Sequence, residues 1–351
     1  MGLFEKLSAK IAIKRYDFSP EIKAGPIDNI TNVVFYAIDG IGDIIVSSPI
    51  IRDLMGKCTG TAYFICSPSS RLYVELLQKH YANIQIIDAS KRQDMTNTEI
   101  DAIARHIAQS APIDIIINGL GRVSPLLARL AHLLRPRALL SVMESAKKIN
   151  KPKMVHNSVH YSNALYRQGV SIVDCWGIIT QLIGGQYNRT LLFPVTQPCP
   201  VKKPYIALSL TGESRGCLTE QNALNICRAI RQHYAGDIYL INSPSISQLC
   251  AKIAAQLQTQ RVFISSPTPS LESSGVFIKH AQALVSVCSA PVHIAGAFDT
   301  PVMVIRNVSQ PEWCPVTSQW EEYITYSNTI NEFDIIIFEQ ILVKFLSKLN
   351  I

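Results

Sequence analysis

Short apolar runs alternate with longer stretches of helical periodicity along most of this chain. In the first half, such runs predict buried strands at 33–38, 61–66, 84–87 and 113–118. Helical periodicity lies between and after them, at 70–80, 97–110, 119–134 and 156–182. Strands separated by helices of this length predict a parallel, doubly wound sheet.

The same alternation begins again at Tyr205. Apolar runs predict strands at 206–210, 238–241, 262–264, 283–287 and 302–305, and helices are predicted at 219–234, 245–257 and 291–298. A last helix is predicted at 332–349. Its apolar residues recur at helical spacing and are expected to pack in the core: Phe333, Ile336, Ile337, Ile341, Phe345 and Leu349.

A polar segment that contains several prolines separates the two series, which is typical of a linker. We therefore predict an α/β fold with two Rossmann-like, doubly wound domains facing across a cleft. The predicted boundaries are 1–185 for the N-terminal domain, 186–204 for the linker, 205–330 for the C-terminal domain and 331–351 for a C-terminal helix.

Composition places the chain among globular proteins, since 48% of its 351 residues are hydrophobic and 17% are charged. The net charge is 33 − 26 = +7, which fits an anionic substrate or a membrane surface and is no nucleic-acid signature. The nine cysteines include no Cys-x-x-Cys pair, which favours reduced thiols in the cytoplasm over disulfides or a zinc site. Neither a signal peptide nor a transmembrane span is predicted.

Two basic segments each allow two interpretations. Residues 1–15 place apolar and lysine side chains on different faces of a helix, which could lie on an anionic membrane surface or pack on the protein. Residues 135–153 carry Arg135, Arg137 and several lysines against one glutamate. That run is either a solvated face or an electropositive rim that attracts a phosphorylated acceptor.

Asp43 is the first candidate for chemistry. The strand at 33–38 breaks at Asp39-Gly40, and Gly40 and Gly42 allow the backbone to turn sharply and approach a ligand. Asp43 then falls at the start of a helix, where the helix dipole favours the ionised carboxylate. It is either a proton acceptor or only a cap of that helix.

A weaker Gly-x-Gly signal follows the strand at 113–118. Gly119 and Gly121, with Arg122, predict another tight turn from strand to helix on the same sheet edge as Asp43. Ligands bind at such edges in open α/β sheets.

Two turns of the second half have the composition of phosphate sites. Residues 211–216 contain Thr211, Gly212, Ser214 and Arg215 and are expected to lead from a strand into a helix, whose first N–H groups could hold a pyrophosphate. In the second turn, Ser289 and Ala290 precede Pro291, which fixes a helix start, and His293 follows within the first turn. His293 could equally be a buried core histidine.

Several ordered motifs resemble glycosyltransferase family 9, the lipopolysaccharide heptosyltransferases. They are Tyr36-Ala-Ile-Asp-Gly-Ile-Gly-Asp-Ile-Ile-Val-Ser-Ser-Pro, Asp114-Ile-Ile-Ile-Asn-Gly-Leu-Gly, Arg215-Gly-Cys-Leu-Thr-Glu-Gln-Asn, Ser289-Ala-Pro-Val-His-Ile-Ala-Gly and Trp313-Cys-Pro. They cover roughly residues 33–316 in the order typical of the family.

The resemblance implies a GT-B fold, with the acceptor on the first domain and the nucleotide sugar on the second. It implies inverting transfer of a heptose or related sugar to a lipopolysaccharide or lipooligosaccharide core, without a metal or other cofactor. ADP-heptose is the implied co-substrate, and a cytoplasmic enzyme, peripheral on the inner face of the inner membrane, is the implied setting. Asp43 matches the proposed general base, Arg215 a phosphate-binding lysine, and His293 the histidine of the second phosphate turn.

Three departures from the family pattern lie in the donor half. Cys288 and Ala290 stand where the family has aspartate and glycine, and the segment 242–248 lacks a glutamate that contacts ribose in many members. Either the donor is not ADP-heptose, or other groups hold it. The alternative is a degenerate member that binds nucleotide or glycan without catalysis. A Rossmann oxidoreductase is a third interpretation, but no glycine turn completes Gly-x-Gly-x-x-Gly.

Overall fold

The protein divides into two compact units in a computed structural model. It describes residues 16, 21, 25–110, 112–119, 123–143, 159–160, 170–212, 216–308, 310–325 and 329–351. Unit 1 comprises Met1–Leu192 with Pro311–Trp313, and unit 2 comprises Phe193–Gln310 with Cys314–Ile351. The division falls within the segment 186–204 that the sequence suggests as a linker.

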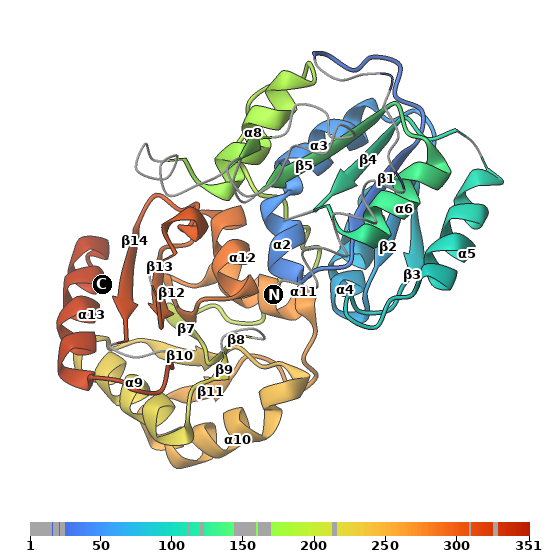
Figure 1. The fold of residues 1–351 in the computed structure, drawn as a ribbon. Helices are drawn as coiled ribbons and strands as arrows, with labels where there is room; N and C mark the ends of the chain where they lie inside the picture. The colour runs from blue at the N-terminus through green and yellow to red at the C-terminus, as the bar shows by residue number, and fades with distance from the viewer. Residues whose placement is uncertain are drawn as a thin grey trace. The chain divides into compact units, whose positions relative to one another are not determined.

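Unit 1 is built on a six-stranded parallel sheet in the order β3-β2-β1-β4-β5-β6 (Figure 1). The strands are β1 (Val33–Ala37), β2 (Ala62–Cys66), β3 (Ile84–Asp88), β4 (Ile115–Asn118), β5 (Ala138–Met143) and β6 (Val159–His160). The central strands β1, β2 and β4 are buried throughout, as expected for a parallel sheet covered on both faces.

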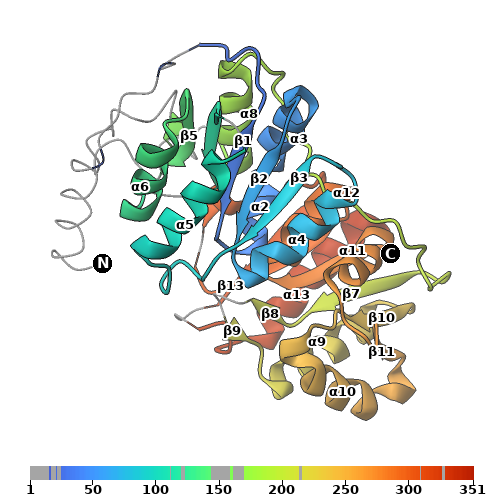
Figure 2. The same ribbon diagram turned by 90° about the vertical axis from the view of Figure 1, so that its right-hand side faces the viewer.

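Helices cover both faces of this sheet (Figure 2). They are α2 (Ile41–Val46), α3 (Ser48–Lys57), α4 (Pro68–Gln78), α5 (Asn97–Ala108), α6 (Pro125–Leu134) and α8 (Ile172–Leu182). Helices α5 and α6 pack over one face, and the others lie over the opposite face. Hydroxyl side chains of Ser67, Thr96, Ser124 and Ser171 cap four of these helices, which sets where each helix begins.

Unit 2 repeats this plan with the order β11-β10-β7-β12-β13-β14, all parallel. Its sheet contains β7 (Tyr205–Ser209), β10 (Asp237–Leu240), β11 (Val262–Ile264), β12 (Ala283–Val287), β13 (Val302–Arg306) and β14 (Trp320–Ile324). The short strands β8 (Thr211–Gly212) and β9 (Gly216–Cys217) pair in an antiparallel hairpin after β7.

The helices of unit 2 also form two layers. They are α9 (Glu220–His233), α10 (Ser247–Gln256), α11 (Leu271–His280), α12 (Ala290–Phe298) and α13 (Ile335–Leu349), with short 3-10 turns at Pro244–Ile246 and Gln258–Gln260. A single apolar core joins α9, α10 and α13 to one face of the sheet, and α11 packs against α12 on the other. Each sheet reverses its strand order once, between β1 and β4 and between β7 and β12.

The structure corrects two predicted helices. The helix predicted at 156–182 is wrong in its first part, because Val159–His160 is a strand and α8 starts only after Ser171, whose hydroxyl caps it. In α13, Ile336 is 67% exposed rather than buried, and Phe338 and Leu342 fill the core instead. The helix starts at Ile335, where Asp334 caps it. Ile336 lies two residues before Phe338, about 200° around the helix, and therefore faces away from the core.

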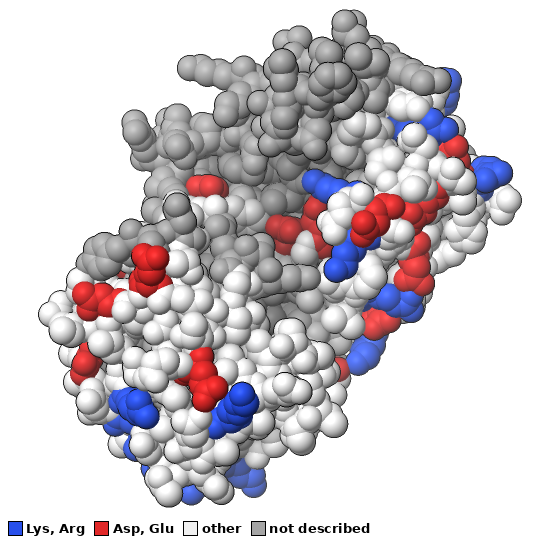
Figure 3. Space-filling view, turned by 60° about the horizontal axis from the view of Figure 1, so that its bottom comes forward, with Lys and Arg blue, Asp and Glu red and all other residues white. Residues whose placement is uncertain are grey.

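Charge and membrane-related predictions have mixed outcomes. The predicted amphipathic helix at 1–15 and the lysines of 147–153 lie outside the described residues. On the face shown in Figure 3, basic and acidic side chains of the described residues are interspersed. No described helix combines the length and the hydrophobicity that a membrane crossing requires.

All nine cysteines are free thiols.

Candidate functional site

The predicted proton acceptor lies where the strand order of unit 1 reverses. Gly40 is the N-cap of α2, and its N–H donates to Oδ2 of Asp43 over 2.9 Å. A Cβ atom at position 40 would lie 3.3 Å from the same oxygen, so the absence of a side chain allows this close turn. Asp43 is therefore a cap of α2, as one of the two interpretations predicts. Among the described residues, no ion pair involves Asp43 and no hydrogen bond engages its other oxygen, Oδ1.

Burial raises the pKa of Asp43 to about 6, and the nearby carboxylate of Asp39 adds to the rise. The N–H of Gly40 and the guanidinium of Arg92 act in the opposite direction. Burial is the largest of these influences, so the net effect opposes the stabilisation of the ionised carboxylate that its place at a helix start predicts. Such a carboxylate is still mostly ionised at pH 7 and is a stronger base than an ordinary aspartate.

The structure adds two charged residues that the sequence analysis did not single out. Asp39 follows β1, and its Oδ2 lies 3.0 Å from Nη2 of Arg92, in the loop between β3 and α5. Burial raises the pKa of Asp39 and Arg92 opposes that rise. The break after the strand makes Asp39 visible in the sequence. Nothing in the sequence indicates its partner 53 positions away.

The second glycine turn of unit 1 is described only in part. Gly119 follows β4, and its N–H donates to the carbonyl of Tyr36 at the end of β1 over 3.5 Å. This contact places the two turns on one sheet edge, as predicted. Gly121 and Arg122, predicted to bind the acceptor, lie outside the described residues, so their roles stay predictions.

Asp114 and Arg137 have a structural role in unit 1. The Asp114 carboxylate accepts the N–H groups of Thr31 and Asn32 and pairs with Arg137 at 3.0 Å. Arg137 also contacts backbone carbonyls before β1. Its charge is therefore used inside unit 1, which removes it from the predicted electropositive rim.

The first predicted phosphate turn of unit 2 has a different local structure. Thr211 and Gly212 pair with Cys217 and Gly216 in a hairpin, and α9 begins only after Thr219, which caps it. The prediction that this loop leads directly into a helix start is therefore wrong, because β-pairing uses its backbone. Ser214 and Arg215 lie outside the described residues, so their predicted roles stay predictions.

The second predicted turn contacts the first. The Ser289 hydroxyl donates to the carbonyl of Thr211 over 2.9 Å and lies 3.0 Å from that of Val287. Because β7 and β12 are neighbours, both turns lie where the strand order of unit 2 reverses. Ser289 is the N-cap of α12 but makes no side-chain cap bond, and Ala290 and Pro291 form the first turn. The N–H groups of that turn are of the kind that bind anions.

His293 lies on α12 and is 5% exposed. Burial and the nearby Arg306 guanidinium lower its pKa to about 4, so the imidazole is neutral at pH 7. Arg306 ends β13, is 3% exposed, and donates to the carbonyl of Gln310 over 2.7 Å. His293 is therefore buried, as the interpretation of a core histidine predicts. It also lies one helical turn from Ser289, beside the predicted site, so both interpretations remain open.

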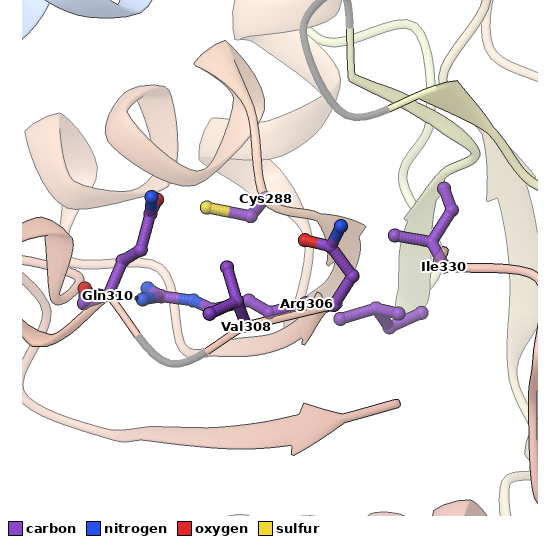
Figure 4. Close-up of a pocket in the computed structure, with 7 residues that line it drawn as sticks. Cys288, Arg306, Val308, Gln310 and Ile330 are labelled. Carbon is purple, nitrogen blue, oxygen red and sulfur yellow. Dashed lines mark hydrogen bonds between the residues drawn. The ribbon is translucent and has the colours of Figure 1, made fainter. Parts of the chain in front are cut away.

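A small pocket lies beside the same turn of unit 2 (Figure 4). It is lined by Cys288, Ile305, Arg306, Asn307, Val308, Gln310 and Ile330. Cys288, which stands where the family pattern has an aspartate, is one of the residues that line this pocket. The segment that lacks the family's glutamate is held internally, with the Asn242 side chain bonded to Ser247 and to the carbonyl of Ser266.

Comparison with known proteins agrees with the resemblance predicted from the sequence. Residues 199–332 match the family model described as glycosyltransferase family 9 (heptosyltransferase). This match covers the motifs of unit 2 that begin at Arg215, Ser289 and Trp313, and it does not extend to Asp43. No curated protein sequence matches the chain closely enough to count as a relative.

Solved structures share the fold along nearly the whole chain. A glycosyl transferase family 9 protein from Veillonella parvula is 12% identical with a TM-score of 0.68, covering 93% of this chain and 98% of its own. The E. coli heptosyltransferase WaaC with ADP is 14% identical with a TM-score of 0.62, covering 90% and 99%. E. coli ADP-heptose lps heptosyltransferase II is 12% identical with a TM-score of 0.60, covering 92% and 100%.

At these identities the structural matches establish the fold, and the family model supplies the sequence relation. The α/β fold class of GT-B type is confirmed, as is the predicted resemblance. Residues 199–332 are therefore similar in sequence to glycosyltransferase family 9 (heptosyltransferase), and the chain shares its fold with solved heptosyltransferases along nearly its whole length.

Proposed function

We propose that the protein is an inverting, metal-independent transferase that moves a heptose or related sugar from a nucleotide sugar to a lipopolysaccharide or lipooligosaccharide core. The observation that carries the proposal is the family 9 match of unit 2, together with an ionisable Asp43 at the strand-order reversal of unit 1. Bound ADP and ADP-2-deoxy-2-fluoro heptose in E. coli WaaC support a nucleotide-sugar donor.

In this proposal, Asp43 removes the proton of the acceptor hydroxyl. As the bond from the sugar to the diphosphate breaks, the anomeric carbon becomes oxocarbenium-like, and the acceptor oxygen attacks from the opposite face. The proton passes to the carboxylate, and the nucleoside diphosphate leaves with the electron pair of the broken bond. A carboxylate with a pKa of about 6 suits this step, because it is ionised at neutral pH and basic enough to accept the proton.

Unit 2 would stabilise the leaving diphosphate without a metal ion. The first turn of α12 provides N–H groups, and the Ser289 hydroxyl bonds to Thr211 in the neighbouring hairpin. A guanidinium from Arg215 would supply fixed positive charge, and neutral His293 would donate or accept one hydrogen bond. Gly121 and Arg122 are proposed to contact the acceptor, and residues 1–15 the inner face of the inner membrane.

Incubating the purified protein with ADP-heptose and a heptose-deficient core glycolipid tests the proposal. We expect ADP release and a glycolipid whose mass increases by one heptose, with the same rate in the presence of EDTA. Nuclear magnetic resonance of the new bond reports inversion. Loss of activity with EDTA, restored by a divalent cation, would contradict metal independence.

Cys288 favours a second candidate, in which the chain binds nucleotide or glycan without catalysis. A thermal-shift panel of nucleotide sugars separates the candidates. A transferase should be stabilised by at least one donor and turn it over with an acceptor. Stabilisation by a nucleotide sugar with no transfer to any core acceptor would favour the binding protein, and a different productive donor would revise only the sugar.

A further inference from the structure

The ion pair of Asp39 and Arg92 is unusual for its position. Asp39 immediately precedes Gly40, whose N–H holds Asp43, so two carboxylates occupy one short turn. Arg92 reaches that turn from the loop between β3 and α5, although β2 separates β3 from β1 in the sheet. The pair therefore joins two loops at the carboxyl edge of unit 1. The Asp39 side chain is 17% exposed and that of Arg92 is 41% exposed.

The loop that carries Arg92 is held in place on both sides. The N–H groups of Asp94 and Met95 donate to the carbonyl of Lys91 over 2.9 and 3.0 Å, and Ser90 donates to Glu99 over 2.6 Å. Met95 is buried, and its sulfur lies 3.4 Å from the hydroxyl of Tyr36 in β1. These contacts fix the loop against the strand that precedes Asp39, so Arg92 does not depend on the ion pair alone for its placement.

We infer that Asp39 and Arg92 are positioning residues for Asp43, which fix the turn that carries it and set the charge around its carboxylate. The inference rests on the proposed function, because the pair acts on the reaction only if Asp43 is its base. Arg92 compensates the charge of Asp39, so that the turn can hold a second carboxylate that ionises near neutral pH. Neither residue needs to contact a substrate for this role.

The direction of each contribution makes the inference testable. The charged side chains that act on Asp43 are Asp39, which raises its pKa, and Arg92, which lowers it. Arg92 also lowers the pKa of Asp39 itself. Removing Asp39 should therefore lower the pKa of Asp43, whereas removing Arg92 leaves an uncompensated carboxylate beside it and should raise that pKa. A loss of folding or of general packing would not produce opposite shifts.

The experiment is a four-variant titration of the full chain. Carboxyl carbon resonances of Asp43, assigned with Asp43→Asn, are followed from pH 4 to pH 8 in wild type, Asp39→Asn, Arg92→Gln and the double variant. We expect the Asp43 midpoint to fall in Asp39→Asn and to rise in Arg92→Gln, each by roughly half a pH unit. The double variant should return close to wild type, and Arg92→Lys, which keeps the charge, should resemble wild type.

Arg71→Gln is the matched control, since it removes another arginine–aspartate pair, with Asp88 at the end of β3. It should leave the Asp43 midpoint unchanged. The acid limb of kcat/KM should move with the midpoint in each variant. Shifts of equal sign in the two single variants, or no shift in either, would overturn the inference. Opposite midpoint shifts that the rate profile does not follow would support the coupling and contradict the role of Asp43 as base.

Discussion

The two units have the same strand plan but carry different chemistry where their strand orders reverse. In unit 1, the turn after β1 holds the partly buried carboxylates of Asp39 and Asp43, and the pKa of Asp43 is raised to about 6. In unit 2, the turns after β7 and β12 present hydroxyls, a helix start and a neutral histidine. The sheet thus selects the position of a site, and the side chains on a few turn residues select its chemistry.

The contrast follows from what burial does to acids and bases. Burial disfavours the charged form of both, so it raises the pKa of Asp43 and lowers that of His293. The first change brings a carboxylate into the range in which a base works at neutral pH. The second removes a positive charge, so that His293 can only form neutral hydrogen bonds above about pH 5. The same effect therefore leaves the turn of unit 1 with a carboxylate that titrates near pH 6 and the first turn of α12 with a neutral imidazole.

The largest expected effect is the loss of transfer on replacing Asp43. Asp43→Asn keeps an oxygen that can accept the N–H of Gly40 but removes the base, so we expect kcat to fall by about 10²–10⁴-fold. The measurement is the rate of nucleotide release with a core acceptor. Asp88→Asn is the matched control, because this side chain is 71% exposed at the end of β3 and should keep nearly full activity. Near-normal turnover in Asp43→Asn would contradict the proposed role of Asp43 as the base, and with it the functional difference between the two units.

A smaller effect is expected from a substitution at the start of α12 in unit 2. Ser289→Ala removes the hydroxyl that links α12 to Thr211, which loosens the hairpin of the proposed diphosphate site. One lost hydrogen bond of about 1 kcal/mol should raise KM for the nucleotide sugar by roughly fivefold, with a smaller change in kcat. Steady-state kinetics with varied donor measures it. Ser245→Ala, on an exposed turn of the same unit, should leave KM unchanged, and an equal rise in both variants would contradict the assignment.

The raised pKa of Asp43 should also lower the stability of the folded protein at high pH. Because the pKa of Asp43 is raised in the folded state, folding is penalised above about pH 6, and the penalty disappears below the ordinary aspartate pKa. Asp43→Asn should therefore raise the free energy of unfolding at pH 8 by about 2–3 kcal/mol and leave it unchanged near pH 3.5. Urea unfolding at the two pH values measures this difference. A destabilised variant at pH 8 would indicate that the carboxylate is mainly structural.

The smallest signal comes from His293. Its lowered pKa means that its contribution to stability is complete above about pH 6.5 and is lost as pH falls toward 4. Imidazole proton resonances assigned with His293→Gln should show no titration between pH 8 and pH 5. A titration midpoint of His293 near pH 6 would show that its imidazole ionises near neutral pH, which would contradict the difference in charge between the two units.

Most of the sheet architecture was predictable because buried parallel strands read as continuous apolar runs. The strands at 33–38 and 283–287 were found within one residue of β1 and β12. Strand β5, from Ala138 to Met143, is not among the predicted strands, because it lies inside the segment 135–153 that the sequence analysis interprets by its charge alone. The outward position of Ile336 in α13 does not follow from apolar spacing, because apolar residues lie on more than one face of this helix and tertiary packing selects the face of Phe338 and Leu342.

The candidate site was predictable where local sequence determines it. Gly40 and Asp43 belong to one turn, and their hydrogen bond spans three residues. The hairpin at Thr211 was not predictable from the glycines, because pairing of Gly212 with Gly216 competes with a helix start. The ion pair of Asp39 with Arg92 depends on tertiary structure, which places loops from two non-adjacent strands side by side.

The pH dependence of kcat/KM in wild type tests the central claim most directly. If the ionised carboxylate of Asp43 is the base, the rate should fall below pH 6 with a slope of one and an apparent pKa of about 6. His293 cannot produce that limb, because its pKa is about 4. A rate that stays level from pH 7 down to pH 4.5, measured with saturating donor and an intact fold, would contradict the account.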